Sequence, residues 1–213
     1  AHQRRALLVM ATGTGKTRTT VALVKQLMAQ GWARRVLFLA DRTALVTQAG
    51  RAFSEHLPEV GSVDLTADRV TEGRVYLSTY PTMMNLIDAA RGPAGERRFG
   101  PGFFDLIVID EAHRSVYRKY GALFDWFDGL LLGLTATPVD DIARSTYRLF
   151  GLEPGVPTDS YPLEEAIADG YLVRPDGYAY DLGFHRRGVH YDELSEEERE
   201  QWDAIDWDEE ADD

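Results

Sequence analysis

Residues Ala11-Thr12-Gly13-Thr14-Gly15-Lys16-Thr17 are the most informative stretch of this chain. They follow the apolar run Leu7-Leu8-Val9-Met10 and precede a helical pattern over residues 18–30. The two glycines allow the backbone to curl so that successive N–H groups point at an anion, and the helix adds its positive N-terminal end. Lys16 can then reach the β- and γ-phosphates, and the Thr17 hydroxyl can ligate Mg²⁺. Residues 12–17 are thus predicted to hold a nucleoside triphosphate; the alternative is an ordinary strand-to-helix turn.

The composition limits the class of protein. The chain has 213 residues, enough for one large α/β domain, and no cysteine, which excludes disulfides and thiolate metal sites. The lack of cysteine suits a cytoplasmic protein, which is our expectation. No apolar run approaches the roughly 20 residues of a membrane span, so we expect no contact with a membrane. Residues 1–150 carry 19 basic and 15 acidic side chains, whereas residues 151–213 carry 4 and 20. The first segment can therefore face a polyanion such as nucleic acid, and the second cannot.

Alternating apolar runs and helical patterns indicate the fold class. Helical patterns over 17–30, 43–56 and 81–90 lie between short runs that show no alternation of polar and apolar residues. Such runs are typical of strands that are buried on both faces of a parallel sheet. The five predicted strands are Ala6–Met10, Val36–Ala40, Val75–Ser78, Leu106–Ile109 and Leu130–Leu134. This pattern predicts a doubly wound α/β domain with its ligand-binding loops at one edge of the sheet.

The alternation of apolar runs and helical patterns ends near residue 150, which suggests a domain boundary there. We expect one lobe over residues 1–150, followed by a connecting segment over 151–184 that packs on the lobe or leaves it. Prolines interrupt this segment, and one short helix is predicted at 162–169. Residues 185–213 are strongly acidic and are predicted to be a linker.

A second candidate site lies in Asp105-Leu106-Ile107-Val108-Ile109-Asp110-Glu111-Ala112-His113. A buried strand here delivers two adjacent acids at its C-terminal end. Asp110 can hold Mg²⁺ together with Thr17, and Glu111 can deprotonate the water that attacks the γ-phosphate. His113 can sense this site from two residues further on. The alternative is a strand end that is merely capped by polar residues, with a surface histidine after it.

A third stretch, Leu132-Gly133-Leu134-Thr135-Ala136-Thr137-Pro138, places two hydroxyls after another predicted buried strand. Because Thr135 and Thr137 are two residues apart, both can face the same side. They could couple His113 to a nucleic-acid surface. The alternative is a strand followed by a helix that begins with proline.

In order along the chain, these segments resemble motifs I, II and III of superfamily-two helicases and translocases of the DEAH-box type. The segments are Ala11–Thr17, Asp110–His113 and Thr135–Pro138. The resemblance implies a three-layer RecA-like P-loop NTPase fold with a mostly parallel sheet. It also implies ATP and Mg²⁺ as cofactors, with Lys16, Asp110, Glu111 and His113 in the catalytic centre.

Two further stretches resemble the family's motifs Ia and Ib, which contact the sugar-phosphate backbone of the tracked DNA strand. They are Phe38-Leu39-Ala40-Asp41-Arg42-Thr43-Ala44-Leu45 and Leu77-Ser78-Thr79-Tyr80-Pro81-Thr82. The resemblance therefore implies sequence-independent DNA contacts, and these fall on Arg42, Thr43, Thr79 and Tyr80. For Arg42 the alternative is an ordinary surface charge at the start of a helix.

More narrowly, the chain is similar to the motor (R) subunit of type I restriction enzymes and to related restriction helicases. The similarity lies in Asp110-Glu111-Ala112-His113-Arg114-Ser115 and in Tyr161-Pro162-Leu163, with the segment 166–172 that follows. It implies an ATP-driven motor that moves along double-stranded DNA, with specificity and modification subunits as partners. The alternatives are a repair-type DNA helicase, a type III restriction motor, and a nucleotide-switched DNA-binding module without turnover.

Several parts of the family pattern have no counterpart in this sequence. The glutamine motif that reads adenine is expected before residue 5, and the second RecA-like lobe after residue 213. No Asp…Glu-x-Lys nuclease pattern precedes the phosphate loop. We therefore expect one motor lobe of a longer protein, which by itself is weakly active or inactive as an ATPase.

Overall fold

The computed structural model of the chain describes residues 3–67, 72–89, 98–112, 115–136, 146–175 and 195. The strands are β1 (Arg5–Met10), β2 (Val36–Ala40), β3 (Ser62–Asp64), β4 (Val75–Thr79), β5 (Leu106–Ile109), β6 (Leu130–Thr135) and β7 (Asp159–Tyr161). The helices are α1 (Lys16–Ala29), α2 (Thr43–His56), α3 (Tyr80–Ala89), α4 (Ser115–Trp126) and α6 (Leu163–Ala168). Residues 146–150 are also helical.

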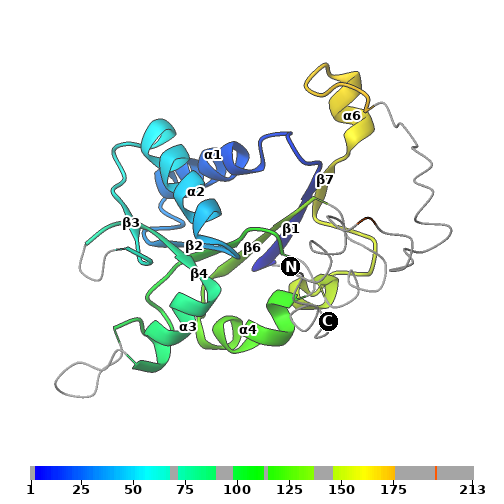
Figure 1. Cartoon of the computed structure of the whole chain (residues 1–213). Helices are drawn as coiled ribbons and strands as arrows, with labels where there is room; N and C mark the ends of the chain where they lie inside the picture. Colours follow the sequence, from blue (N-terminus) through cyan, green and yellow to red (C-terminus); the bar gives the residue numbers. More distant parts are fainter. Residues whose placement is uncertain are drawn as a thin grey trace. The chain divides into compact units, whose positions relative to one another are not determined.

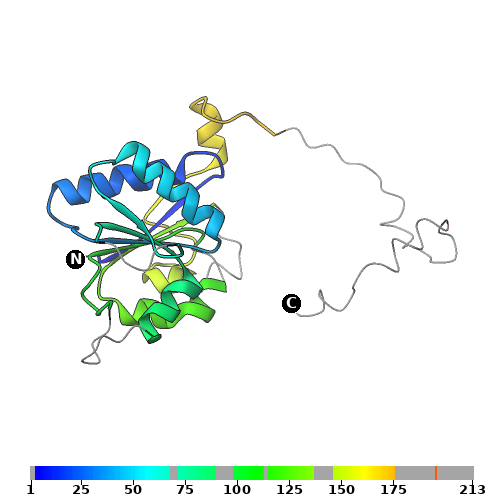
Figure 2. The same cartoon turned by 60° about the vertical axis from the view of Figure 1, so that its left-hand side comes forward.

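The seven strands form one sheet in the order β3-β4-β2-β5-β6-β1-β7, and every strand pair in it is parallel. Helices α1 and α2 cover one face of the sheet, and α3 and α4 cover the other (Figures 1 and 2). The predicted doubly wound α/β fold with a mostly parallel sheet is therefore confirmed. Parallel strands all end at the same edge, so the segments after β1, β2, β4, β5 and β6 emerge together.

Two hydrophobic clusters hold the three layers together, and β2 contributes to both. Its residues Val36, Phe38 and Ala40 pack in the cluster that includes the inner faces of α1 and α2. The intervening Leu37 and Leu39 pack in the cluster that includes α3 and α4. Successive side chains of a strand point to opposite faces, so a strand with helices on both sides is apolar at most of its positions. This explains why the central strands appear in the sequence as unbroken apolar runs.

The edge strands β3 and β7, helix α4 and the helical residues 146–150 were not predicted. Strand β7 matters most for the domain boundary, because it pairs with β1 through Leu8↔Asp159 and Met10↔Tyr161. The sheet therefore extends past the expected boundary at residue 150, and the first compact unit runs from Ala1 to Val173. The predicted acidic linker at 185–213 lies outside the described residues, apart from Ser195. Among the helices of the described ranges, none has the length and apolar character that crossing a bilayer requires.

Candidate nucleotide-binding site

The phosphate loop connects β1 to α1 and is shaped by its two glycines. Gly13 and Gly15 have φ values of 87° and 90°, in the left-handed region that side chains disfavour. The Thr14 hydroxyl and amide both donate to the Ala11 carbonyl, at 2.6 and 3.3 Å, which closes the turn. Gly15 is the N-cap of α1, and no side chain caps the first N–H groups of that helix. These N–H groups and the helix dipole make the loop a ready site for a phosphate.

The acids after β5 lie against this loop. Lys16, the first residue of α1, donates from Nζ to Oε1 of Glu111 at 3.1 Å. The two side chains are 13% and 32% exposed, so the pair lies at the mouth of the site rather than in bulk solvent. Asp110 is buried, and its Oδ1 accepts the Glu111 N–H at 3.1 Å. The structure thus brings together the two stretches whose proximity the sequence analysis required.

The loop and the acids line one pocket of about 640 Å³, a volume typical of small-molecule sites. Its other wall comes from α2, which packs beside α1 (Figure 1). The lining residues are Thr12, Gly13, Gly15, Lys16, Thr17, Arg18, Leu45, Gln48, Arg51, Ala52, Glu55, His56, Asp110 and Glu111. Sequence reasoning missed Arg18 and Arg51, whose cationic heads suit a phosphate-binding pocket. It also missed Leu172: a Cβ added at Gly13 would lie 3.3 Å from its Cδ2, so Leu172 packs against the loop.

The donors in this pocket fit a magnesium ion. A threonine hydroxyl (Thr17) and a carboxylate (Asp110) offer the hard oxygen ligands that Mg²⁺ prefers. Protein Mg²⁺ sites usually supply only one or two carboxylates and leave the remaining positions to water and substrate phosphates. Thr17 and Asp110 both line the pocket, so their sharing one ion remains a prediction that the geometry permits.

The predicted coupling and DNA-contact residues differ in how far the structure exposes them. Arg42 is 82% exposed at its side chain, directly before α2, and makes a 3.8 Å ion pair with Asp41. Thr43 is the first residue of α2 and is also exposed. Thr135 is buried at the end of β6. His113 and Thr137 lie outside the described residues.

Two of the predicted DNA contacts need correction. Tyr80 is 0% exposed, and its hydroxyl donates to the main-chain oxygen of Asp110 at 3.1 Å, so the predicted contact of its side chain with DNA is wrong. Thr79 is 6% exposed, and its hydroxyl lies 2.9 Å from that of Thr82. Its side chain therefore has little surface to offer a DNA strand. A motif marks where the chain passes the ligand, and not which of its side chains point outward. Contacts of the main chain of this segment with DNA therefore stay a prediction.

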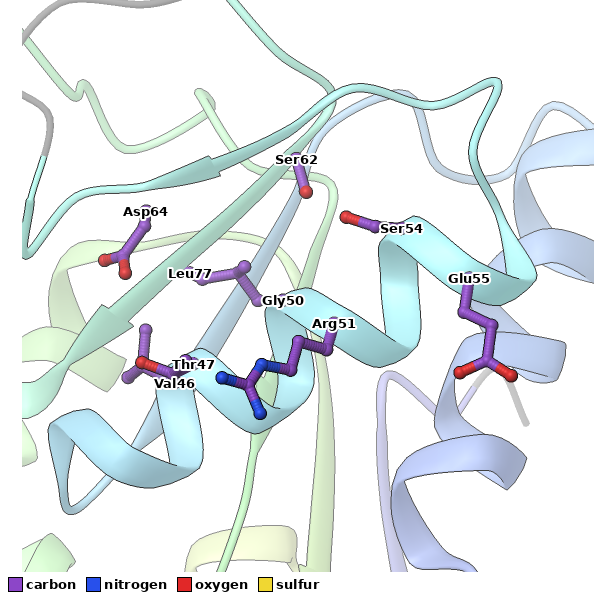
Figure 3. A pocket seen from close by; sticks show the side chains of 9 residues that line it. All are labelled: Val46, Thr47, Gly50, Arg51, Ser54, Glu55, Ser62, Asp64 and Leu77. Atoms are coloured by element: carbon purple, nitrogen blue, oxygen red, sulfur yellow. The ribbon is translucent and has the colours of Figure 1, made fainter.

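A second pocket, of about 570 Å³, lies between α2 and the outer strands β3 and β4 (Figure 3). Its lining residues are Val46, Thr47, Gly50, Arg51, Ser54, Glu55, Ser62, Asp64 and Leu77. None of these residues was predicted to belong to a site. Arg51 and Glu55 also line the pocket beside the phosphate loop, so α2 separates the two hollows.

Residues 1–140 match the family model described as "Type III restriction enzyme, res subunit". The chain belongs to this family. It is a superfamily-two helicase-like motor lobe of the kind found in restriction-enzyme R subunits. The resemblance that the motifs suggested is thereby confirmed at the level of the family.

Individual relatives of this motor lobe agree with the assignment. It is 38% identical over 179 residues to the endonuclease subunit of the type I restriction enzyme EcoAI from Escherichia coli, covering 80% of this chain and 21% of that subunit. A solved fragment assigned to the HsdR subunit of a type I restriction enzyme from Vibrio vulnificus is 30% identical, with a TM-score of 0.55 over 79% of this chain and 28% of that one. The Hef helicase domain of Pyrococcus furiosus is 25% identical, with a TM-score of 0.56 over 75% and 35%. The chain thus spans about a fifth of the EcoAI subunit.

Proposed function

We propose that this lobe binds ATP with Mg²⁺ at the phosphate loop and hydrolyses it as part of a DNA-translocating restriction motor. The observation that carries the proposal is the 3.1 Å ion pair between Lys16 Nζ and Glu111 Oε1. It joins the loop that is suited to phosphates to an acid that can activate water. A fold of this class binds ligands where parallel strands end, and both groups lie at that edge.

The chemistry proposed for each residue follows from its place in the pocket. The N–H groups of residues 12–17 hold the triphosphate, and Lys16 moves its charge from Glu111 to the phosphate oxygens when ATP binds. The released Glu111 carboxylate then accepts a proton from the attacking water. Thr17 and Asp110 would hold Mg²⁺, and a bound ion would offset the negative charge of the triphosphate.

The DNA-facing part of the proposal rests on the exposed start of α2. Arg42 and Thr43 are available to phosphates of one strand, and residues 1–150 carry a net charge of +4. Contacts of this kind hold any sequence equally and weaken as salt increases. Thr135, with His113 and Thr137, would couple the nucleotide site to the grip on DNA.

A complete motor would need more than this lobe, which spans about a fifth of the EcoAI subunit. We propose that a second RecA-like lobe closes over the ATP and supplies an arginine finger, which is worth roughly 10³–10⁵ in rate. The chain by itself should therefore hydrolyse ATP slowly, and specificity and modification subunits would join the full assembly. For this reason the full-length protein is the right material for a test.

The proposal is tested by measuring ATP hydrolysis by the full-length protein with and without double-stranded DNA. Glu111→Gln should lower kcat by about 10²–10⁴, the usual contribution of a general base, while ATP still binds. Lys16→Ala should weaken ATP binding itself, because it removes the cation that contacts the phosphates. Lys25→Ala on the same helix and Glu59→Gln beyond α2 are exposed and serve as matched controls.

The outcomes separate the proposed motor from its alternatives. Wild-type turnover in the Glu111→Gln and Lys16→Ala variants would refute the ATPase site. Nucleotide-dependent DNA binding without any turnover would indicate a nucleotide-switched binding module instead. Displacement of a third strand from a DNA triplex, without separation of an ordinary duplex, would favour a translocase over a repair-type helicase.

A further inference from the structure

Tyr80 lies directly beneath the acids of the nucleotide site. It is the first residue of α3, and it is completely buried. Its hydroxyl donates to the carbonyl of Asp110 at 3.1 Å. That carbonyl belongs to the peptide group joining Asp110 to Glu111. The side chain that the motif assigned to DNA is therefore bonded to the backbone of the catalytic acids.

The backbone at this point has an unusual conformation. Glu111 has a φ of 52° and is the only non-glycine residue with positive φ in the described part of the chain. Left-handed geometry disfavours a residue with a side chain, so the surroundings must hold it in place. On one side of the turn the Asp110 N–H donates to Leu39 of β2, and on the other the Ala112 N–H donates to Leu134 of β6. The chain thus changes its partner strand across Glu111.

The hydroxyl of Tyr80 is well suited to hold this turn. Its ring stacks on Tyr120 of α4, with centroids 5.3 Å apart and an interplanar angle of 14°, which fixes the ring. Burial, and then the negative charge of Asp110, raise the pKa of Tyr80 well above its ordinary value. The stacked ring and its complete burial therefore fix the hydroxyl where it donates to the Asp110 carbonyl.

We propose that Tyr80 is a positioning residue that acts through the Asp110 carbonyl to hold the Glu111 turn, so that the Glu111 carboxylate faces Lys16 and the γ-phosphate. This inference rests on the proposed ATPase function and adds a residue to it. Tyr80 follows Thr79 directly, so it also ties the segment that resembles motif Ib to the water-activating acid. A displacement at the start of α3 would then be transmitted to Glu111 through one hydrogen bond.

The test is Tyr80→Phe in the full-length protein, because this change removes the hydroxyl and keeps the ring and its stacking. Loss of one such hydrogen bond should lower kcat for DNA-stimulated ATP hydrolysis about tenfold. The KM for ATP and the affinity for DNA should stay unchanged, because no group that contacts either ligand is altered. Tyr76→Phe is the matched control: Tyr76 is also buried, in the same hydrophobic cluster, but its hydroxyl accepts the Gly73 N–H at 3.4 Å, away from the acids.

A double-mutant cycle shows whether Tyr80 acts through Glu111. If it does, adding Tyr80→Phe to Glu111→Gln should cause no further fall in kcat. A tenfold fall that persists in the Glu111→Gln background would overturn the proposal, since Tyr80 would then act by another route. Wild-type kcat in Tyr80→Phe would overturn it as well.

Hydrogen exchange provides a readout that does not depend on turnover. Amides of residues 110–112 should exchange faster in Tyr80→Phe than in the wild type, and at the wild-type rate in Tyr76→Phe. If the wild-type protein hydrolyses no ATP, the proposed function fails, yet faster exchange would still support the positioning role. Unchanged exchange in Tyr80→Phe would contradict that role, whatever the ATPase result.

Discussion

Replacing Gly133 by alanine should destabilise the lobe, because the structure leaves no room for a methyl group at this position. Gly133 lies in β6 opposite Leu7 of β1. A Cβ added there would lie 2.3 and 2.8 Å from Cζ and Cε2 of Phe150, and 2.9 Å from Cδ1 of Leu7. All three distances are shorter than carbon atoms tolerate. Both neighbours are buried, so neither can move aside without disturbing its own packing.

The expected loss in the free energy of unfolding follows from two opposing effects. Overpacking of a well-filled core typically costs about 1–3 kcal/mol. Replacing glycine by alanine restricts the unfolded chain, which stabilises the folded state by about 0.4–1 kcal/mol. We therefore expect a net loss of about 1–2 kcal/mol, which for a chain of this size lowers Tm by roughly 2–8 °C.

The assay is thermal unfolding followed by circular dichroism, with Gly61→Ala as the control. No heavy atom lies within 4 Å of a Cβ added at Gly61, and its backbone is not left-handed, so its Tm should change little. Adding Phe150→Leu to Gly133→Ala removes the two clashing atoms of Phe150, but not Cδ1 of Leu7, and should recover part of the loss. If Gly133→Ala has the same Tm as the wild type, Phe150 does not pack against β6 as the structure shows.

Three other expectations can be checked independently. Asp105→Ala should cost about 1.5–3 kcal/mol in urea unfolding, because Oδ2 of Asp105 accepts two backbone N–H groups, of Arg34 and Arg35, at 2.9 Å each; an unchanged midpoint would exclude this role. Arg42→Ala should weaken binding to all DNA sequences alike and reduce the slope of log K against log salt by about 1, as measured by titrations at several salt concentrations. A loss confined to one DNA sequence would contradict a phosphate contact. The pKa of Tyr80 is raised above 10.0 in the folded protein, so the unfolded chain loses this proton at a lower pH than the folded chain does. The free energy of unfolding should therefore fall as pH rises past 10. If it falls equally steeply in the wild type and in Tyr80→Phe, the raised pKa of Tyr80 does not contribute to the fall.

The apolar runs located the five central strands to within one residue at each end, and for a clear reason. These strands have helices on both faces, so most of their positions are apolar, and adjacent residues by themselves reveal the strand. Strands β3 and β7 carry no such signal, since Ser62–Asp64 and Asp159–Tyr161 are short and mostly polar. They are strands because neighbouring strands pair with them. Helix α4 contains a non-helical residue at Tyr120, which interrupts the pattern that would have revealed it.

Part of the candidate site, too, could be predicted from the sequence, and part depends on the fold. The phosphate loop and the paired acids could be predicted because glycine, lysine, threonine and carboxylate chemistry is carried by residues adjacent in sequence. That Tyr80 reaches Asp110 depends on strand order: β4 and β5 flank β2, so the residues following them meet beyond its end. Nothing within either segment indicates that neighbour. The local chemistry could therefore be predicted from the sequence, whereas the buried contact between Tyr80 and Asp110 exists only because parallel strands distant in sequence end at one edge of the sheet.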